Sequence, residues 1–554
     1  MQSHDNPNIA SALGEMAQSM PDDTAIYYPK HRTPDGTWRY EEMSYAELDD
    51  YSTDIAAGLH EIGITPGTRA VLMVEPSMEF FALTFALFKA AVVPVMVDPG
   101  MGLSNLKTCL AEAEPTAFIG VSKAQLARVV LRWGSSTIEH RITVGRRWLW
   151  GGHKLEQVRQ KGADVDAFQT PGVTADEMAA ILFTSGSTGV PKGAVYNHGN
   201  FTAQVDQIRK TYDIEPGEID LPTFPLFALF DPALGMTTVL PEMDFANPGT
   251  VNPRNLVEPI EQFGVTNMFG SPAVMDKLGR YVTDHDTELP SLNRVISAGA
   301  PVPSQTLRRV SSMLDGDAEI HTPYGATESL PVASIGSREI LEETADRTDR
   351  GDGVCVGRPV DAIDVEVIDI VDDPIETWSD DLIADDGTVG EFVVKGPQVT
   401  ERYYNRPEAT NEAKIQDGKG LRHRMGDVGY IDDAGRMWFC GRKSHRVVID
   451  DDTTMFTICC EAVFNTHPKV YRTALVGARR AGDVVPVLCV ELEEEHRGAV
   501  RERLRDELRE IAVQFDHTES IDTFLFHDSF PVDVRHNSKI FREELTQWAT
   551  TNLK

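Results

Sequence analysis

Cysteine is scarce in this sequence, with six among 554 residues. Their spacing contains no C-x-x-C pair and no framework of the kind found in disulfide-rich secreted domains. The six are Cys109, Cys355, Cys440, Cys459, Cys460 and Cys489. Three of them lie near His445 in sequence, but not at the spacing of zinc ligands. We therefore expect reduced thiols and a cytoplasmic protein.

Positive charge is also in short supply, because 52 Lys+Arg face 86 Asp+Glu and leave a formal net charge of −34. A non-specific nucleic-acid binder needs the opposite sign, so no nucleic-acid partner is expected. Anionic membranes should also repel this surface. We expect a strongly solvated, salt-adapted surface, on which a local cluster of donors has to hold any anionic substrate.

A secretion signal and a transmembrane segment are not expected either. The first ten residues, MQSHDNPNIA, have neither a basic nor an apolar leader stretch. The most apolar stretch, residues 80–97, is interrupted by Lys89 and Pro94. It therefore predicts a buried helix followed by a strand, not a membrane span.

What the sequence does contain is an alternation of helical and strand patterns in its first part. Ser44 and Glu47 form a capping box before a helix with an apolar face, and Gly63 is placed to end that helix. Strands are predicted over residues 70–74 and 92–97, with a helix over 77–90 between them. This β-α-β order predicts an α/β sheet covered by helices.

The pattern changes twice towards the C-terminus. Strands without helices between them, around residues 363–367 and 389–395, predict a small antiparallel β subdomain. A compact α+β domain is then predicted, which begins near residues 441–443. Its strands are expected over residues 473–477, 484–492 and 523–526, and a charged helix over residues 498–515.

The strongest chemical signal is a loop rich in glycine and hydroxyl groups, TSGSTGVPKG, which runs from Thr184 to Gly193 after an apolar strand. Glycines let backbone N–H groups approach phosphate oxygens, hydroxyls donate further hydrogen bonds, and Lys192 supplies positive charge. It is not a Walker A loop, because glycine follows the lysine. A flexible linker is the alternative, which the preceding strand disfavours. The candidate nucleotide ligands are Thr184, Ser185, Gly186, Ser187, Thr188 and Gly189.

This segment resembles the signature of the adenylate-forming superfamily, which includes acyl-CoA synthetases, peptide-synthetase adenylation domains and luciferases. Other motifs similar to those of the superfamily follow in order: SAGAP at 297–301, YGATE at 324–328, GDVGY at 426–430 and GRK at 441–443. Each is weak evidence alone. Together the resemblance extends over residues 44–545, nearly the whole chain.

The resemblance implies roles for the residues around the nucleotide base and phosphates. Gly299, Ala300 and Pro301 would lie beside the adenine. Tyr324, which precedes Gly325, would stack on the adenine. Thr327 would bind the α-phosphate. Glu328 would bind Mg²⁺, which prefers hard carboxylate oxygens.

It also implies the ribose contacts, the fold and the domains. Asp427 would hold the ribose hydroxyls with Arg442 nearby, and Lys539 aligns with the C-terminal lysine of the adenylation step. The fold class implied is α/β. It has a large N-terminal AMP-binding domain of α/β sheets with a small β-barrel subdomain, residues 1–440, and a small mobile α+β C-terminal domain, residues 441–554.

Several departures narrow the resemblance to one branch. Ala228 follows Pro-Leu-Phe where the superfamily often has histidine, and Ser444 stands at the hinge position. Residues 448–458 lack the glycine of the loop that helps acyl-CoA synthetases admit pantetheine, which disfavours transfer to CoA. Four longer segments resemble the olefin β-lactone synthetases: 224–236, 322–333, 441–447 and 534–543.

That branch implies ATP- and Mg²⁺-dependent adenylation of a long-chain 2-alkyl-3-hydroxy fatty acid, with Lys539, Thr327, Glu328 and Lys192 in catalysis. The 3-hydroxyl would then displace AMP and close a β-lactone. The resemblance also implies an olefin-forming assembly with a thiolase, a reductase and a β-lactone decarboxylase. Two alternatives stay open: a fatty acyl-CoA synthetase or acyl-AMP ligase, and a non-catalytic nucleotide-binding protein with the same fold.

A base for the 3-hydroxyl is not evident from the sequence. His198, His321 and His445 lie near motifs. A lone histidine in a loop is more often structural or solvated, so none of them is assigned.

Overall fold

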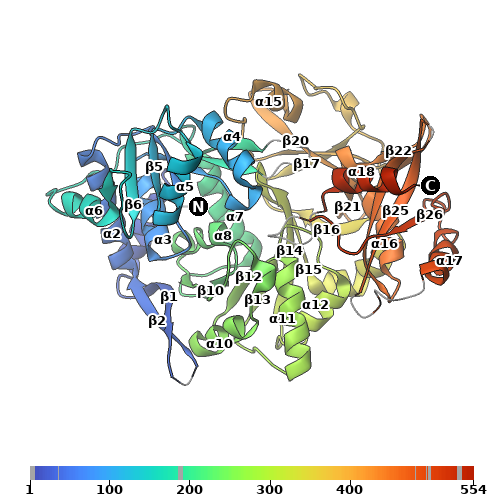
Figure 1. Ribbon diagram of the computed structural model, residues 1–554, viewed down its shortest axis with the longest axis horizontal. Helices are drawn as coiled ribbons and strands as arrows, with labels where there is room; N and C mark the ends of the chain where they lie inside the picture. Colours follow the sequence, from blue (N-terminus) through green and yellow to red (C-terminus); the bar gives the residue numbers. More distant parts are fainter. Residues whose placement is uncertain are drawn as a thin grey trace.

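The computed structural model describes residues 7–34, 36–184, 191–480, 482–493, 496, 501–532 and 540–553. Two large sheets and two small sheets, one of three strands and one of two, organise these residues. Figure 1 shows the seven-stranded sheet towards one end, around β5 and β6, and the elements after residue 441 at the opposite end.

The seven-stranded sheet has the order β7-β6-β5-β3-β4-β8-β9. All neighbouring strands are parallel except β8 and β9, which form an antiparallel pair at one edge. The strands are β3 (Arg69–Met73), β4 (Val93–Met96), β5 (Ala117–Val121), β6 (His140–Val144), β7 (His153–Lys154), β8 (Met178–Thr184) and β9 (Lys192–Asn197).

Helices cover this sheet as the β-α-β pattern predicts. They are α2 (Tyr45–Glu61), α3 (Met78–Lys89), α4 (Leu103–Ala113), α5 (Ser122–Leu131), α6 (Leu155–Ala163) and α7 (His198–Tyr212). The predicted capping box of α2 is confirmed: Ser44 accepts from the Glu47 N–H, and the Glu47 carboxylate accepts from the Ser44 N–H. The apolar stretch at residues 80–97 is a buried helix and strand, as predicted.

The second large sheet has fourteen strands in the order β17-β18-β20-β21-β16-β15-β14-β13-β12-β10-β11-β1-β2, with β19 paired to β20. The strands that come first in the chain are β1 (Thr24–Arg32), β2 (Trp38–Ser44), β10 (Ile219–Pro222), β11 (Thr237–Val239), β12 (Asn267–Gly270), β13 (Arg294–Ser297) and β14 (Glu319–Ala326). The strands that follow in the chain are β15 (Ser329–Gly336), β16 (Val354–Pro359), β17 (Asp364–Ile368), β18 (Gly390–Lys395), β19 (Lys414–Asp417), β20 (Gly420–Ile431) and β21 (Met437–Arg442).

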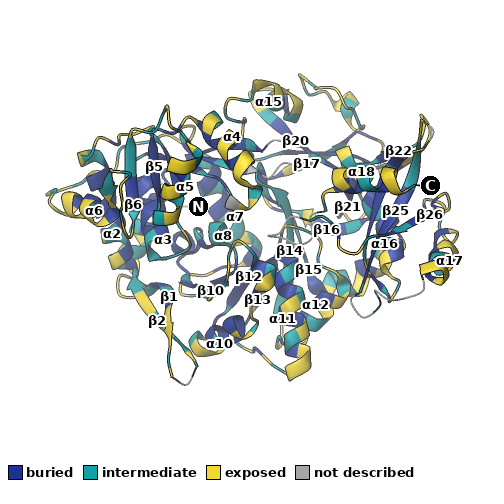
Figure 2. Cartoon of the chain, in the orientation of Figure 1, coloured by how far each residue is buried: buried dark blue, intermediate teal, exposed yellow. Residues whose placement is uncertain are grey.

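The helices that accompany this sheet are mostly short. They are α1 (Ala10–Ser19), α8 (Pro225–Ala228), α9 (Asp231–Leu234), α10 (Arg254–Phe263), α11 (Pro272–His285), α12 (Ser304–Ser311), α13 (Ser337–Glu339), α14 (Ala345–Asp349) and α15 (Pro407–Ala413). Because helices cover the sheets, the strands are largely buried while the helices expose one face, as Figure 2 shows.

The predicted antiparallel subdomain is present, but it continues the fourteen-stranded sheet. β16 pairs with both β15 and β21, so the strands after residue 354 extend the same sheet. Among the described residues, the pairing order is linear and does not close into the expected small β-barrel.

The last part of the chain is a compact α+β unit, as predicted. Its elements are β22 (Val447–Val448), β23 (Thr454–Met455), α16 (Thr457–Asn465), β24 (Val470–Arg480), β25 (Asp483–Leu492), α17 (Arg501–Ala512), β26 (Thr523–Phe526) and α18 (Arg542–Asn552). β24, β25 and β26 form a three-stranded sheet with its own apolar core. The domain boundary at residue 440 stays a prediction.

No helix in the described part of the chain combines the length and the apolar character needed to cross a bilayer.

Candidate active site

Thr327 and Glu328 form the tip of a tight hairpin between β14 and β15. Ala326 pairs with Ser329, so these two residues alone make the turn. Gly325 is required beside them, because a Cβ at that position would lie 2.7 Å from the Ser329 carbonyl oxygen. The Tyr196 hydroxyl donates to the Thr327 carbonyl and fixes the tip against β9. The hairpin therefore presents the two predicted polar side chains at a defined place.

The Glu328 carboxylate has one partner that the sequence did not predict. The Tyr403 hydroxyl donates to its Oε1 at 2.5 Å, and the Tyr403 ring lies 5.3 Å from the Lys192 ammonium. Burial and the Glu328 charge raise the pKa of Tyr403, so the phenol stays protonated and donates. The second carboxylate oxygen accepts no hydrogen bond from a described residue. Lys192 and Glu328 are thus brought together around one aromatic ring.

Strand pairing explains how Tyr403 reaches this place. Residues 402–404 run along β9, with the Val195 N–H donating to the Arg402 carbonyl at 3.0 Å and the Tyr404 N–H donating to the Gly193 carbonyl at 2.7 Å. Ala194 and Tyr403 form an antiparallel bridge. The end of the predicted phosphate loop is therefore locked to a segment about two hundred residues further along the chain.

A buried lysine, Lys414, lies behind the hairpin tip. Its ammonium donates to the Thr400 carbonyl, and the Thr400 N–H donates in turn to the Glu328 carbonyl at 2.8 Å. Burial lowers the pKa of Lys414 to about 7, while the Glu328 and Glu401 charges oppose that shift. The sequence analysis did not identify this residue, because it lies outside every motif.

The predicted ribose residues form a continuous hydrogen-bonded group. Asp427 in β20 pairs with Arg442 in β21, and the Arg442 guanidinium donates to Asp427 Oδ1 at 2.6 Å. The Tyr324 hydroxyl donates to Asp427 Oδ2 at 2.7 Å. The Asp427 carboxylate is the main reason why the pKa of Arg442 is raised. Glu328 also contributes to that shift, which places both predicted groups in one electrostatic neighbourhood.

The segment predicted to lie beside adenine is a turn at the end of β13. Gly299 has φ of +102°, a conformation that favours glycine, and Ala300 and Pro301 continue the turn. β13 and β14 are parallel neighbours, and β14 continues past the end of β13, so the turn after Ser297 lies at the carboxyl edge of β13 beside the part of β14 that carries Tyr324. Ligands bind at such carboxyl edges in open α/β sheets.

Two predicted groups cannot be placed. Ser185, Gly186, Ser187, Thr188 and Gly189 lie outside the described residues, and so does Lys539. The backbone of Thr184 ends β8 opposite Lys192. The chain therefore enters and leaves the predicted phosphate loop at neighbouring positions of one hairpin.

The histidines near the motifs give no base for the 3-hydroxyl. Burial lowers the pKa of His198 to about 4, and its Nδ1 has no hydrogen-bond partner among the described residues. His321 lies in β14 with its ring against Tyr212, and burial lowers its pKa as well. His445 Nε2 lies 3.6 Å from the Glu543 carboxylate. We assign the role to none of them.

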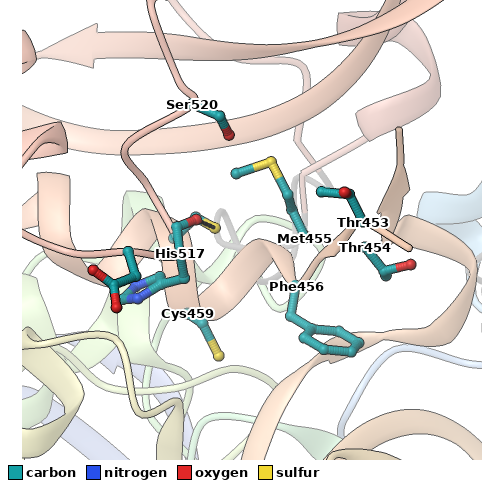
Figure 3. A pocket seen from close by; sticks show the side chains of 9 residues that line it. Thr453, Thr454, Met455, Phe456, Cys459, His517 and Ser520 are labelled. Carbon is teal, nitrogen blue, oxygen red and sulfur yellow. Dashed lines mark hydrogen bonds between the residues drawn. The ribbon is translucent and has the colours of Figure 1, made fainter. Parts of the chain in front are cut away.

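A separate cavity of about 140 Å³ lies in the C-terminal unit. Figure 3 shows its lining, where Met455 and His517 flank the space and the thiol of Cys459 points away from Ser520. This volume suits water rather than a nucleotide, because ligand sites usually measure about 300–1,000 Å³. All six cysteines have free thiols, and the described residues contain no metal-binding group of three or more His, Cys, Asp or Glu.

Comparisons with known proteins agree with this geometry. The sequence profile of the AMP-binding enzymes matches residues 13–404. An olefin β-lactone synthetase of Xanthomonas campestris is 49% identical over 98% of this chain and 97% of its own length. The corresponding enzyme of Stenotrophomonas maltophilia is 48% identical over 99% of each.

The chain belongs to the AMP-binding enzymes, in the family of the olefin β-lactone synthetases.

Enzymes of the AMP-binding family form adenylates and use ATP. The fold is also found in a solved structure, that of the amide bond synthetase McbA from Marinactinospora thermotolerans, with a TM-score of 0.78. That similarity covers 98% of this chain and 99% of the other at 21% identity, so it concerns the fold alone. In this AMP-binding enzyme, the described candidate site is the group around Glu328 and the group around Asp427.

Proposed function

We propose that this protein activates a long-chain 2-alkyl-3-hydroxy fatty acid with ATP and then closes it to a β-lactone. The observation that supports this most strongly is the identity of 49% to an olefin β-lactone synthetase over nearly the full length of both chains. The arrangement of Lys192, Tyr403, Glu328, Asp427 and Arg442 supports the ATP-dependent step.

In the first step, a carboxylate oxygen attacks the α-phosphorus of ATP and pyrophosphate leaves. The barrier is largely electrostatic, because two anions have to meet. Thr327, Lys192, the hydroxyls of the 184–189 loop and Lys539 would donate to the developing negative charge. Asp427 would accept from the ribose hydroxyls, while Tyr324 and residues 299–301 hold the adenine.

The residues present fit a magnesium ion as well. Glu328 offers a carboxylate with one oxygen held by Tyr403 and the other accepting no hydrogen bond from a described residue. Mg²⁺ is usually held by one or two carboxylates together with substrate phosphates and water, so one such group is sufficient. When bound, the ion would neutralise phosphate charge.

In the second step, the 3-hydroxyl oxygen attacks the activated carbonyl carbon and AMP leaves, while the hydroxyl proton passes to a base that we do not assign. Ring strain opposes the closure. The mixed anhydride provides driving force, and a nucleophile within the same molecule reacts at high effective molarity. No second substrate has to enter, in keeping with the glycine-free segment at residues 448–458.

The wider setting is part of the same proposal. The chain would consist of an AMP-binding domain over residues 1–440 and a mobile domain over 441–554. It would act in the cytoplasm, in an assembly with a thiolase, a reductase and a β-lactone decarboxylase that together make olefins. The free thiols of all six cysteines are compatible with a reducing compartment.

One incubation tests the reaction. The enzyme receives ATP, Mg²⁺ and a 2-alkyl-3-hydroxy acid, with and without CoA, and NMR identifies the products. We expect a β-lactone, AMP and pyrophosphate in both cases. The matched acid without the 3-hydroxyl should stop as bound acyl-AMP. Thioester formation from both acids, without lactone, would support the acyl-CoA synthetase instead; absence of pyrophosphate release would support a non-catalytic binding protein.

A further inference from the structure

One end of the molecule reverses the charge of the rest. Residues 122–161 contain nine Lys+Arg and two Asp+Glu, whereas the whole chain has a net charge of −34. This segment forms α5, β6, β7 and most of α6. Figure 1 places these elements at the end of the molecule opposite to the C-terminal elements.

The same segment exposes apolar side chains. Five of the eleven large hydrophobic side chains that the described residues expose lie within it: Leu126, Val129, Val130, Trp148 and Leu149. The first three have the spacing of one helical face on α5. Trp148 is 59% exposed and Leu149 is fully exposed, in the loop between β6 and β7. An apolar surface of this kind requires an explanation in a monomeric globular protein.

The loop over residues 145–152 is tied to α5 at its start and closed by a hydrogen bond between its two ends. The Ser122 hydroxyl donates to the Arg146 carbonyl and ties the loop to the start of α5. Across the loop, the Arg147 guanidinium donates to the Gly152 carbonyl and joins its two ends.

The aromatic residues of the tip form an ordered group. The Trp150 indole N–H donates to the Thr143 hydroxyl at 3.0 Å, and the rings of Trp148 and Trp150 are stacked with centroids 6.2 Å apart. The Arg146 guanidinium lies 5.8 Å from the Trp148 ring. The exposed Leu149 therefore lies between two stacked tryptophans, one of which contacts the Arg146 guanidinium.

The surrounding cations are not neutralised by neighbouring carboxylates. Of the nine Lys+Arg in residues 122–161, only Arg159 forms an ion pair within the described part of the chain, with Asp54 at 3.3 Å. His153 lies among these basic residues. Partial burial first, and then Lys161, Arg147 and His140, lower the pKa of His153. The field at this end of the molecule is therefore positive.

We propose that this end of the protein docks on the surface of an anionic phospholipid bilayer. Trp148 and Leu149 enter the headgroup region, where tryptophan is favoured, and the basic side chains contact lipid phosphates. The acidic remainder of the surface is repelled by the same bilayer and so orients the molecule. The repulsion expected from the net charge therefore applies to the rest of the surface and not to this end.

A bilayer fits this surface better than a protein partner does. A fully exposed leucine on a protruding loop enters a soft layer without a matching pocket, whereas a protein partner would need complementary shape over a larger area. A long-chain acid also partitions into bilayers, so docking would bring the enzyme to its substrate. That last reason rests on the proposed function; the docking itself does not.

Co-sedimentation with vesicles tests the docking. The full-length protein is mixed at low salt with vesicles of phosphatidylcholine that contain about 30% phosphatidylglycerol. We expect binding that falls as NaCl rises, and little binding to pure phosphatidylcholine. The double variant Trp148→Ser/Leu149→Ser and the variant Arg146→Glu should each bind at least about tenfold more weakly. The matched control is Val513→Ser, which removes an exposed valine at the end of α17.

The possible outcomes are distinct. Loss of vesicle binding in the loop variants but not in Val513→Ser, with ATP–pyrophosphate exchange unchanged in all, supports the docking. Wild-type protein that ignores anionic vesicles, or loop variants that bind like wild type, overturns it. A dimer that the loop variants dissociate in sedimentation velocity, without vesicle binding, makes the surface a protein interface and also overturns the proposal. Vesicle binding without lactone formation would count against the proposed function only.

Discussion

At the scale of single residues, the surroundings of Glu328 determine what its carboxylate can do. Tyr403 donates to one carboxylate oxygen, and the backbone carbonyl of the same glutamate accepts from Thr400. Glu328 is thus held both at its carboxylate and at its backbone. A carboxylate held in this way keeps its charge directed at one place, which suits a group that has to meet a cation and phosphates.

We expect Glu328→Gln to raise the Mg²⁺ concentration needed for half-maximal ATP–pyrophosphate exchange by about tenfold or more, since losing a charged ligand contact costs roughly 1.5–3 kcal/mol. The amide keeps the shape and an oxygen that can accept from Tyr403, so folding should be preserved. Exchange assays over a Mg²⁺ titration measure the effect.

Tyr403→Phe is the matched variant, because it keeps the charge and removes only the hydroxyl that orients it. Its shift in Mg²⁺ dependence should be smaller than that of Glu328→Gln. An unchanged Mg²⁺ dependence in Glu328→Gln, with full activity at saturation, would show that Glu328 is not the ligand.

Lys414 gives a prediction about stability and pH. Its pKa is about 7 in the folded protein and 10.5 ordinarily, so between these values the unfolded chain binds the extra proton. The free energy of unfolding therefore rises with pH across that window, by up to about 1.4 kcal/mol per pH unit. Below about pH 7 the lysine is charged in both states, and the folded protein bears the full cost of burying that charge. In Lys414→Met this slope should vanish.

Urea unfolding of the wild type and Lys414→Met at about pH 7.5 and 9 measures the slope. The wild type should gain roughly 2 kcal/mol relative to the variant between these pH values. The lost hydrogen bond to Thr400 lowers the stability of the variant by the same amount at every pH, so it does not affect the difference in slope between the two proteins. Parallel pH profiles would mean that the lysine is charged throughout.

At the scale of elements, the backbone of the β14–β15 hairpin determines where the Thr327 and Glu328 side chains lie. We expect Gly325→Ala to destabilise the protein by about 1–3 kcal/mol and to reduce adenylation strongly, because overpacking against backbone displaces the turn. The new Cβ would lie 2.7 Å from the Ser329 carbonyl oxygen and 2.8 Å from Leu330 Cδ1. Thermal unfolding and pyrophosphate exchange measure the two effects.

Gly172→Ala is the control for that substitution, since no atom lies within 4 Å of the position its Cβ would occupy. It should be neutral in both assays. Adenylation at the wild-type rate in Gly325→Ala would show that the position of the hairpin tip does not limit the reaction.

Elements that are determined by residues near one another in sequence were predictable, whereas pairings between segments far apart in sequence were not. The capping box at Ser44 and the alternation of residues 363–367 specify α2 and β17 through neighbouring residues. The pairing of residues 402–404 with β9 depends on segments far apart in sequence, so no local pattern predicts it. The same holds for the linear continuation of the long sheet, where a small barrel was expected.

The candidate site divides in the same way. Tyr324, Asp427 and Arg442 were predicted from motifs, and the structure brings them into hydrogen-bonding distance. Tyr403 and Lys414 were missed, because a tyrosine and a lysine outside any motif carry no signal until the fold buries them beside Glu328. Burial supplies their chemistry, and burial is a property of the whole fold.

At the scale of the whole molecule, the net charge of −34 is the dominant feature. Like charges over one compact surface repel each other more strongly in the folded state than in the expanded chain. Apart from the basic end formed by residues 122–161, the described cations are often already paired with carboxylates, as Arg424 is with Glu391 and Arg542 with Glu461. The remaining acidic charge is free to repel and open to screening by salt.

We therefore expect NaCl to stabilise the fold, with a rise in Tm of several degrees between low salt and about 0.5 M. The shape of the curve identifies the cause. The Debye length falls from about 10 Å at 0.1 M to about 3 Å at 1 M, so a screening effect is steep at first and then levels off. Stabilisation by exclusion of salt from the surface would instead continue to grow with concentration.

Thermal unfolding over a NaCl series, repeated near pH 5 where the net charge is small, separates the two causes. At that pH the early rise should disappear, because the repulsion that salt screens is then largely absent. A Tm that falls with NaCl, or that rises equally at both pH values, would contradict a fold limited by its own negative charge.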